Sequence, residues 1–258
     1  MALTTAKDMV LGLRTVTPLL PAETGALDGL AYTLWLPPSP GPPARAGVVV
    51  LHGADSCKES HHDFARAAVA QGLGAICFDQ RGHGESSGAL GPGVLDDVAA
   101  IAGHLRRALG DSEAPLAVRG SSMGGYLTIL AAPVLRARAA VAICPASANG
   151  LRRGLDEEGR FSFAADRPGL RAFLDAHDLT LAARQLTMPL LLLHAEGDER
   201  VPIAHSRELA AVLTVPGSRL IAVPGGHHRS IQHDEELQAV SLRFIGQALG
   251  AARREGPA

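Results

Sequence analysis

The sequence predicts an α/β fold in which a mostly parallel central sheet is flanked by helices. Short apolar runs alternate with Ala-, Leu- and Arg-rich stretches of helical period along most of the 258 residues. The run 47–51 is apolar throughout, which is typical of a strand buried on both faces of a sheet. With 47% hydrophobic and 19% charged residues, the chain can bury a large core, so we expect no global disorder.

The expected elements follow one another in a regular order. Most strands are short apolar runs bounded by Gly or Pro, and the helices repeat apolar residues every three or four positions. A proline-rich turn at 37–43 closes the first strand, and the tail 251–258 is expected to fray. Strands are expected at 30–36, 47–51, 74–78, 116–119, 139–144, 190–193 and 219–223, and helices at 62–71, 94–109, 125–136, 203–213 and 230–249.

The alternation of strands and helices breaks at about 148–186. This stretch contains Gly, Arg and acidic residues, two Phe and two or three short helical segments. We interpret it as an insertion within a single domain that spans residues 1–258.

Composition excludes several classes of function. The net charge of −2 is spread along the chain, so we expect no nucleic-acid partner and no electrostatic membrane anchor. No run of about 18 apolar residues occurs, and residues 1–14 lack a secretion signal. The three widely spaced cysteines do not suggest a disulfide framework. We therefore expect a soluble, cytoplasmic protein; its oligomeric state is not predicted.

The segment 120–124, Gly-Ser-Ser-Met-Gly, is a G-x-S-x-G pattern centred on Ser122. By itself the pattern is weak, but here it follows an apolar strand and opens a helix, which is the context of a nucleophile elbow. A tight turn there needs glycine at both flanks because neighbouring backbone comes close. The helix beginning at Met123 directs its amino end at the site, where an acyl-transfer reaction develops negative charge.

Residues 47–53 followed by this elbow resemble the α/β-hydrolase superfamily. A second segment, 79–86, reads Asp-Gln-Arg-Gly-His-Gly-Glu-Ser and is similar to the D-x-R-G-H-G-x-S loop of small esterases, lysophospholipase-like enzymes and serine-aminopeptidase-like hydrolases. The resemblance implies an α/β-hydrolase fold with a small helical lid, formed here by the insertion. It implies a structural role for the 79–86 loop and no catalytic one.

The same resemblance implies a catalytic acid after the strand at 190–193. The segment 194–202 is similar to the family's G-x-x-D-x-x-V-P loop, with Ala195 in place of its Gly, and this puts the acid at Asp198. Glu196 and Glu199 are nearby alternatives that we interpret as surface charges. The segment 145–150 contains no carboxylate, so an acid one strand earlier is excluded.

The catalytic base is expected after the last strand. Aligning Pro-Gly-Gly at 224–226 with the family's P-G-A-x-H pattern puts it at His228, and His227 remains the alternative. His228 would then accept the proton of Ser122, and Asp198 would orient the imidazole. The resemblance also assigns the oxyanion hole to the backbone amides of Ala54 and Met123, with His52 structural.

We expect no metal and no cofactor. Two histidine pairs are adjacent in sequence, at 61–62 and 227–228, and neighbouring side chains point apart; no metal-ligand spacing is present. Cys57 is not at the elbow, and the elbow holds Ser rather than Cys or Asp, which disfavours the chemistries that use those nucleophiles.

Three functions are compatible with these residues. The first is hydrolysis of carboxylic esters, and possibly thioesters, on a small-molecule substrate. The second is hydrolysis of small peptides or amides, for which Asp156, Glu157 or Glu158 could bind a free amine. The third is a binding protein without turnover, which the Ser, Asp and His set argues against. The acyl group and leaving group cannot be predicted, because they depend on pocket shape.

Overall fold

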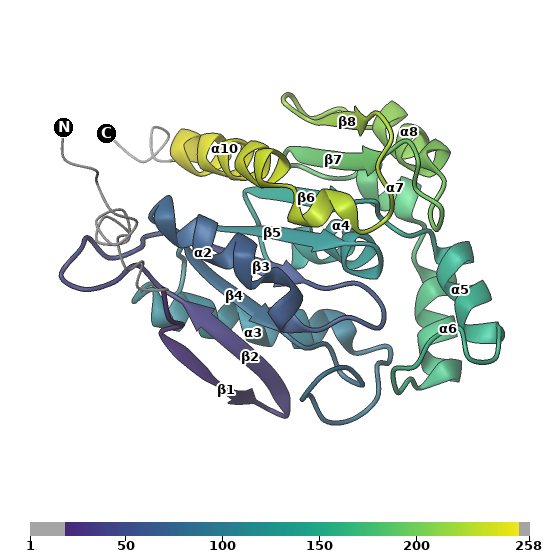
Figure 1. Ribbon diagram of the computed structural model, residues 1–258, viewed down its shortest axis with the longest axis horizontal. Helices are drawn as coiled ribbons and strands as arrows, with labels where there is room; N and C mark the ends of the chain where they lie inside the picture. The colour runs from purple at the N-terminus through teal and green to yellow at the C-terminus, as the bar shows by residue number, and fades with distance from the viewer. Residues whose placement is uncertain (1–18, 253–258) are drawn as a thin grey trace, which may run out of the picture.

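A computed structural model describes residues 19–252 of the chain (Figure 1). Within this range the strands form one sheet of eight with the order β1-β2-β4-β3-β5-β6-β7-β8. All neighbouring strands from β4 to β8 are parallel, whereas β1 and β2 form a hairpin whose second strand pairs antiparallel with β4. The predicted, mostly parallel sheet is confirmed. The strands are β1 (Glu23–Leu27), β2 (Leu30–Trp35), β3 (Gly47–Leu51), β4 (Gly74–Phe78), β5 (Leu116–Ser121), β6 (Ala139–Ile143), β7 (Leu190–Ala195) and β8 (Arg219–Val223).

Helices cover both faces of the sheet and create two apolar cores. Because successive side chains of a strand point to opposite faces, Val49 and Leu51 of β3 pack with α3 and α4, whereas Val48 and Val50 pack with α2 and α10. The helices are α2 (His62–Ala70), α3 (Val94–Ala108), α4 (Met123–Val134), α5 (Ala148–Asp156), α6 (Arg167–Ala176), α7 (Leu179–Arg184), α8 (Ile203–Ala211), α9 (Ser230–His233) and α10 (Glu235–Ala252), with a 3-10 turn η1 at Lys58–His61.

Strands β3, β4 and β8 begin and end at the predicted residues, but β1 was not predicted. Its five residues are mostly exposed and show no apolar alternation, because β1 lies at the edge of the sheet. The turn that joins it to β2 is Asp28-Gly29, both with positive φ (49° and 83°), a strong local signal for a two-residue hairpin.

The last predicted helix is divided in two. Asp234 has an extended ψ of 121° and ends α9. Its Oδ1 accepts a hydrogen bond from the amide of Leu237 at 2.9 Å, which caps the new helix α10. Of the predicted tail, only Ala251 and Ala252 lie inside the described range; residues 253–258, like the segment 1–14, lie outside it.

The segment between β6 and β7 contains α5, α6 and α7, and α5 and α6 lie together at one end of the molecule in Figure 1. The connection between α5 and α6 is attached to the body. Ala164 donates its amide to Gly82 O (3.2 Å) and accepts from Leu90 N (2.9 Å). Asp55 Oδ1 accepts from the amide of Ser162 (2.7 Å) and from its hydroxyl (2.8 Å). These contacts bring the insertion beside the loop that follows β3.

Between residues 19 and 252, no helix is both long and apolar enough to cross a membrane. Cys57, Cys77 and Cys144 are free thiols in this structure.

Candidate active site

Ser122 lies between the last residue of β5 and the first residue of α4, with φ 54° and ψ −117°. A side chain in this region of backbone space costs on the order of 1–3 kcal/mol. A Cβ atom added to Gly120 would lie 2.3 Å from the carbonyl oxygen of Gly124, and one added to Gly124 would lie 2.3 Å from that of Leu51. Close backbone contacts therefore require both glycines, as the sequence predicted.

The backbone around Ser122 also orients the amide of Met123. The carbonyl of Ser122 accepts hydrogen bonds from the amides of Tyr126 and Ala146, each at 3.0 Å. In a trans peptide, a carbonyl and the amide of the next residue point in opposite directions, so the Met123 amide points out of the N-terminal end of α4. It has no hydrogen-bond partner among the residues the structure describes.

The amide of Ala54 is oriented in a similar way by buried His52. The backbone amide of Gln80 donates a hydrogen bond to His52 Nε2 at 2.9 Å. The ring proton is therefore on Nδ1, which lies 2.7 Å from the carbonyl oxygen of Gly53. This contact fixes the Gly53–Ala54 peptide and directs the Ala54 amide the opposite way. Burial, and then nearby His83, lowers the pKa of His52 to about 4, so the ring is neutral at physiological pH. His52 has the contacts of a structural residue.

The 79–86 loop supports this arrangement. Asp79 is fully buried and accepts the amide (2.7 Å) and the Nζ (3.0 Å) of Lys58 on its two oxygens. It also accepts the Glu85 amide at 2.9 Å. A Cβ on Gly84 would lie 2.2 Å from Asp79 Oδ2, which explains that glycine. Sequence reasoning missed buried Lys58, one of only two lysines in the chain.

Asp198 lies in the loop after β7, and both of its carboxylate oxygens have hydrogen-bond partners. Its Oδ1 accepts the amides of Arg200 and Val201 at 2.8 Å each, and its Oδ2 lies 2.7 Å from Nδ1 of His228. Burial alone would raise the pKa of Asp198, but the hydrogen bonds from His194, from His228 and from the two amides outweigh it and hold the pKa well below its ordinary value. The carboxylate is therefore charged at physiological pH.

A second imidazole also contacts this carboxylate. His194, buried in β7, has Nε2 at 3.4 Å from Asp198 Oδ2 and 2.9 Å from Val201 O, and Nδ1 at 2.7 Å from Ser206 Oγ. It does not line the pocket around Ser122, so it secures the loop of Asp198. The sequence signal that could have found it is a histidine at a buried position directly after four leucines.

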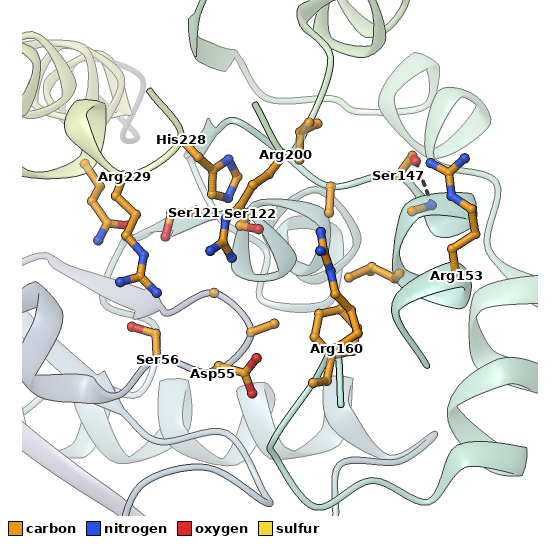
Figure 2. Close-up of a pocket in the computed structure, with 18 of the residues that line it drawn as sticks. Asp55, Ser56, Ser121, Ser122, Ser147, Arg153, Arg160, Arg200, His228 and Arg229 are labelled. Carbon is orange, nitrogen blue, oxygen red and sulfur yellow. Dashed lines mark hydrogen bonds between the residues drawn. The ribbon is translucent and has the colours of Figure 1, made fainter. Parts of the chain in front are cut away.

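His228 and Ser122 line the same pocket, and the ring of His228 lies next to Ser122 in the view of Figure 2. Because Nδ1 of His228 is engaged by Asp198, Nε2 is the ring nitrogen that remains for a proton from Ser122. His227 has an exposed side chain and does not line the pocket. The structure thus brings Ser122, Asp198 and His228 together and leaves His227 apart.

The two other acids near Asp198 have surface contacts. Glu196 forms an ion pair with Arg207 at 3.2 Å. Glu199 is exposed and accepts the amide of His228 at 3.1 Å, so it contacts the backbone of the proposed base without replacing Asp198 at the ring.

The pocket has a volume of about 120 Å³ and lies where the carboxyl ends of β3, β5, β6, β7 and β8 meet. The insertion contributes to its wall through Leu151, Arg153, Arg160 and Phe161. Leu151 and Phe161 also line a second, wholly apolar pocket of about 10 Å³ between the insertion and the body. Phe161 lines both pockets.

The acids that the peptidase alternative requires are not at the pocket. Asp156 forms an ion pair with Arg171, and neither it nor Glu157 or Glu158 lines the cavity. The one carboxylate in the lining is that of Asp55, whose Oδ1 accepts hydrogen bonds from the amide and the hydroxyl of Ser162.

One group of potential metal ligands overlaps the site: Cys144, Asp198 and His228 have ligand atoms within 4.8 Å of one another. Burial raises the pKa of the Cys144 thiol, which opposes formation of the thiolate that a metal prefers. The carboxylate and the imidazole are already bonded to each other. The donor chemistry does not suit a resident metal.

Known proteins resemble this chain in sequence. Residues 42–161 match the family model described as serine aminopeptidase, S33, a range that includes Ala54 and Ser122 but ends before Asp198 and His228. The uncharacterized protein YfhR of Escherichia coli is 28% identical over 240 residues, which cover 88% of this chain and 80% of that protein. A monoacylglycerol lipase of Mycolicibacterium smegmatis is 25% identical over 252 residues, which cover 80% of this chain and 88% of the lipase.

Solved structures resemble it in fold. Est1E of Butyrivibrio proteoclasticus, determined with ferulic acid, superposes with a TM-score of 0.71 at 20% identity and covers 90% of this chain and 100% of its own. At these identities the similarity concerns the fold.

Proposed function

We propose that this protein, which has the α/β-hydrolase fold, hydrolyses carboxylic esters of small molecules through an acyl-enzyme on Ser122. Asp198 is the acid, His228 the base, and the amides of Ala54 and Met123 form the oxyanion hole. The observation that carries this proposal is the 2.7 Å contact between Asp198 Oδ2 and His228 Nδ1 at the wall of the pocket that Ser122 lines.

The reaction follows from these contacts. His228 Nε2 takes the proton of Ser122 as Oγ attacks the ester carbonyl, and the imidazolium is stabilised by Asp198. The oxyanion accepts the amides of Ala54 and Met123, whose peptides are fixed before substrate arrives. His228 then donates the proton to the leaving alcohol. Water, deprotonated by His228, attacks the acyl-enzyme; the acid is released as the bond to Ser122 Oγ breaks, and His228 returns the proton to that oxygen.

Esters are favoured over other acyl substrates by two considerations. The relatives with a named activity include a monoacylglycerol lipase, and an esterase of Pyrococcus furiosus has the same fold. The match to the serine aminopeptidase model supports amide hydrolysis as the second candidate. That candidate needs a carboxylate for a free amine, and the pocket wall offers only Asp55. Thioesters would use the same residues.

We also propose that the insertion, about 148–186, acts as a small lid, because its residues form one wall of the pocket. The cavity is small and the apolar pocket beside Phe161 has a volume of only about 10 Å³, so short acyl groups fit without rearrangement. The three free cysteines support a reducing, cytoplasmic location.

A series of p-nitrophenyl esters from acetate to decanoate, assayed beside Ser122→Ala, tests the proposal. We expect turnover to peak among the short acyl groups and to vanish in the variant. Residual activity in Ser122→Ala would reject Ser122 as the nucleophile. An enzyme that is labelled by a fluorophosphonate but hydrolyses no ester would favour the amide alternative, and absence of both labelling and turnover would favour a protein without catalysis.

A further inference from the structure

The wall of the Ser122 pocket carries an excess of positive charge. Four arginines line it, whereas the whole chain has a net charge of −2. Three of them, Arg160, Arg200 and Arg229, surround Ser122 in Figure 2, and the fourth, Arg153, lies farther off beside Ser147.

These guanidinium groups are poorly compensated. Among the described residues, no carboxylate lies within 4.0 Å of Arg160 or Arg229. Arg200 has only a 3.9 Å contact with exposed Glu199. Asp55 also lines the pocket, but its Oδ1 holds Ser162. The carboxylate of Asp198 is hydrogen-bonded to the ring of His228 and does not pair with any arginine side chain that the structure describes.

The backbone keeps the three arginines near the reaction centre. Arg229 directly follows His228, and Arg200 follows Asp198 by two residues, with its own amide donated to that carboxylate at 2.8 Å. Arg160 lies two residues before Ser162, which is bound by Asp55 next to Ala54. Each arginine therefore belongs to a segment held by contacts at the site.

We propose that the ester substrate carries an anionic group, a carboxylate or a phosphate, which Arg160, Arg200 and Arg229 bind while Ser122 attacks the ester. This inference rests on the proposed esterase function and names its substrate class. A guanidinium presents paired N–H donors that match both oxyanions, and its charge does not depend on pH. The same charge repels a free amine, so it also argues against an aminopeptidase.

Matched pairs of esters test the inference. On the acyl side, the p-nitrophenyl monoester of adipate and the p-nitrophenyl ester of phosphonopentanoate are compared with neutral p-nitrophenyl hexanoate. On the leaving-group side, p-carboxyphenyl butyrate is compared with p-tolyl butyrate. We expect kcat/KM to favour an anionic member over its neutral partner by about tenfold in at least one pair, and this ratio to fall with added salt. The adipate and phosphonate arms separate carboxylate from phosphate as the preferred anion.

Variants then assign the preference to the arginines. Arg160→Gln, Arg200→Gln and Arg229→Gln should each lower the anionic-to-neutral ratio by about twofold to threefold, since exposed ion pairs are individually modest. Arg107→Gln removes the same charge from an exposed site on α3 and is the control.

Ratios at or below one in all three comparisons would overturn the inference while leaving the esterase proposal intact. So would variants whose ratios change no more than that of the control. A wild type that hydrolyses no ester and takes no fluorophosphonate label would instead overturn the proposed function, and this inference with it.

Discussion

Nδ1 of His52 lies 2.7 Å from the carbonyl oxygen of Gly53, the residue that follows it in the chain. Because this contact fixes the Gly53–Ala54 peptide, a buried side chain that does not line the pocket controls the direction of a proposed oxyanion donor. The relationship makes His52 a positioning residue whose effect on catalysis can be separated from its effect on stability.

Replacing His52 should lower kcat more than it changes KM. Loss of one oxyanion donor costs roughly 10²–10³ in kcat, and a misdirected donor should cost a part of that, about tenfold in His52→Leu. His52→Asn keeps an N–H near the position of Nδ1 and should retain more of kcat. Steady-state kinetics on one ester measures both variants. Equal loss in Leu and Asn would contradict the positioning role.

His52 should also make stability depend on pH. Its pKa is 6.5 ordinarily and about 4 in the folded protein, so between these values the unfolded chain binds more protons. The free energy of unfolding should therefore fall as pH is lowered from 6.5 to 4, by up to about 3 kcal/mol from this residue, and the loss should level off below 4. Urea unfolding at several pH values should give a shallower dependence for His52→Asn than for the wild type. Parallel curves would show that His52 is not responsible.

The two adjacent histidines should differ sharply. His228→Gln should lower kcat/KM by about 10³ or more, since a triad member is lost, whereas His227→Gln should stay within about threefold because its side chain is exposed and away from the pocket. Ester hydrolysis by both variants decides the assignment. A larger loss in His227→Gln would transfer the role of base to that residue.

The conformation of Ser122 should be measurable as strain. Ser122→Ala and Ser122→Gly both remove the hydroxyl, but only alanine keeps a Cβ at φ 54°. We expect the glycine variant to be more stable than the alanine variant by about 1 kcal/mol, after allowance for its more flexible unfolded chain. Chemical denaturation of the inactive pair measures the difference. If the alanine variant is the more stable one, the turn is not strained.

Lys58 should be critical for stability. Its side chain is 2% exposed and 3.0 Å from fully buried Asp79, so Lys58→Met leaves that carboxylate with two backbone amides but no cation and should cost about 3 kcal/mol. Arg136→Met breaks an exposed ion pair with Glu113 and should cost under about 1 kcal/mol. A similar cost for the two variants would mean that the buried pair has no special role.

Much of the fold could be predicted from the sequence, because the patterns that specify these strands and turns lie within short segments. Strands β3 and β4 are apolar runs next to glycines, and the elbow glycines reflect contacts within one strand–turn–helix unit. The hairpin strand β1 was not predicted, because an edge strand does not need alternating apolar residues.

Parts of the site could not be predicted from the sequence, since they depend on distant segments. The approach of His194 to Asp198 requires the loop between them to fold back. The gathering of Arg160, Arg200 and Arg229 requires three separate loops to meet at one pocket. In the printed sequence these arginines resemble any other surface charges.

Asp55 links the insertion at Ser162 to the loop after β3 that contains Ala54. Its side chain holds Ser162, next to the aromatic wall formed by Phe161, and its backbone adjoins Ala54. A bulky acyl group that pushes Phe161 aside would pull on this link and disturb the Ala54 amide, which we propose donates a hydrogen bond to the oxyanion. Selection by acyl size would then act on turnover as well as on binding. An engineered enlargement of the pocket should therefore restore turnover of bulky esters only when the contact between Asp55 and Ser162 is retained.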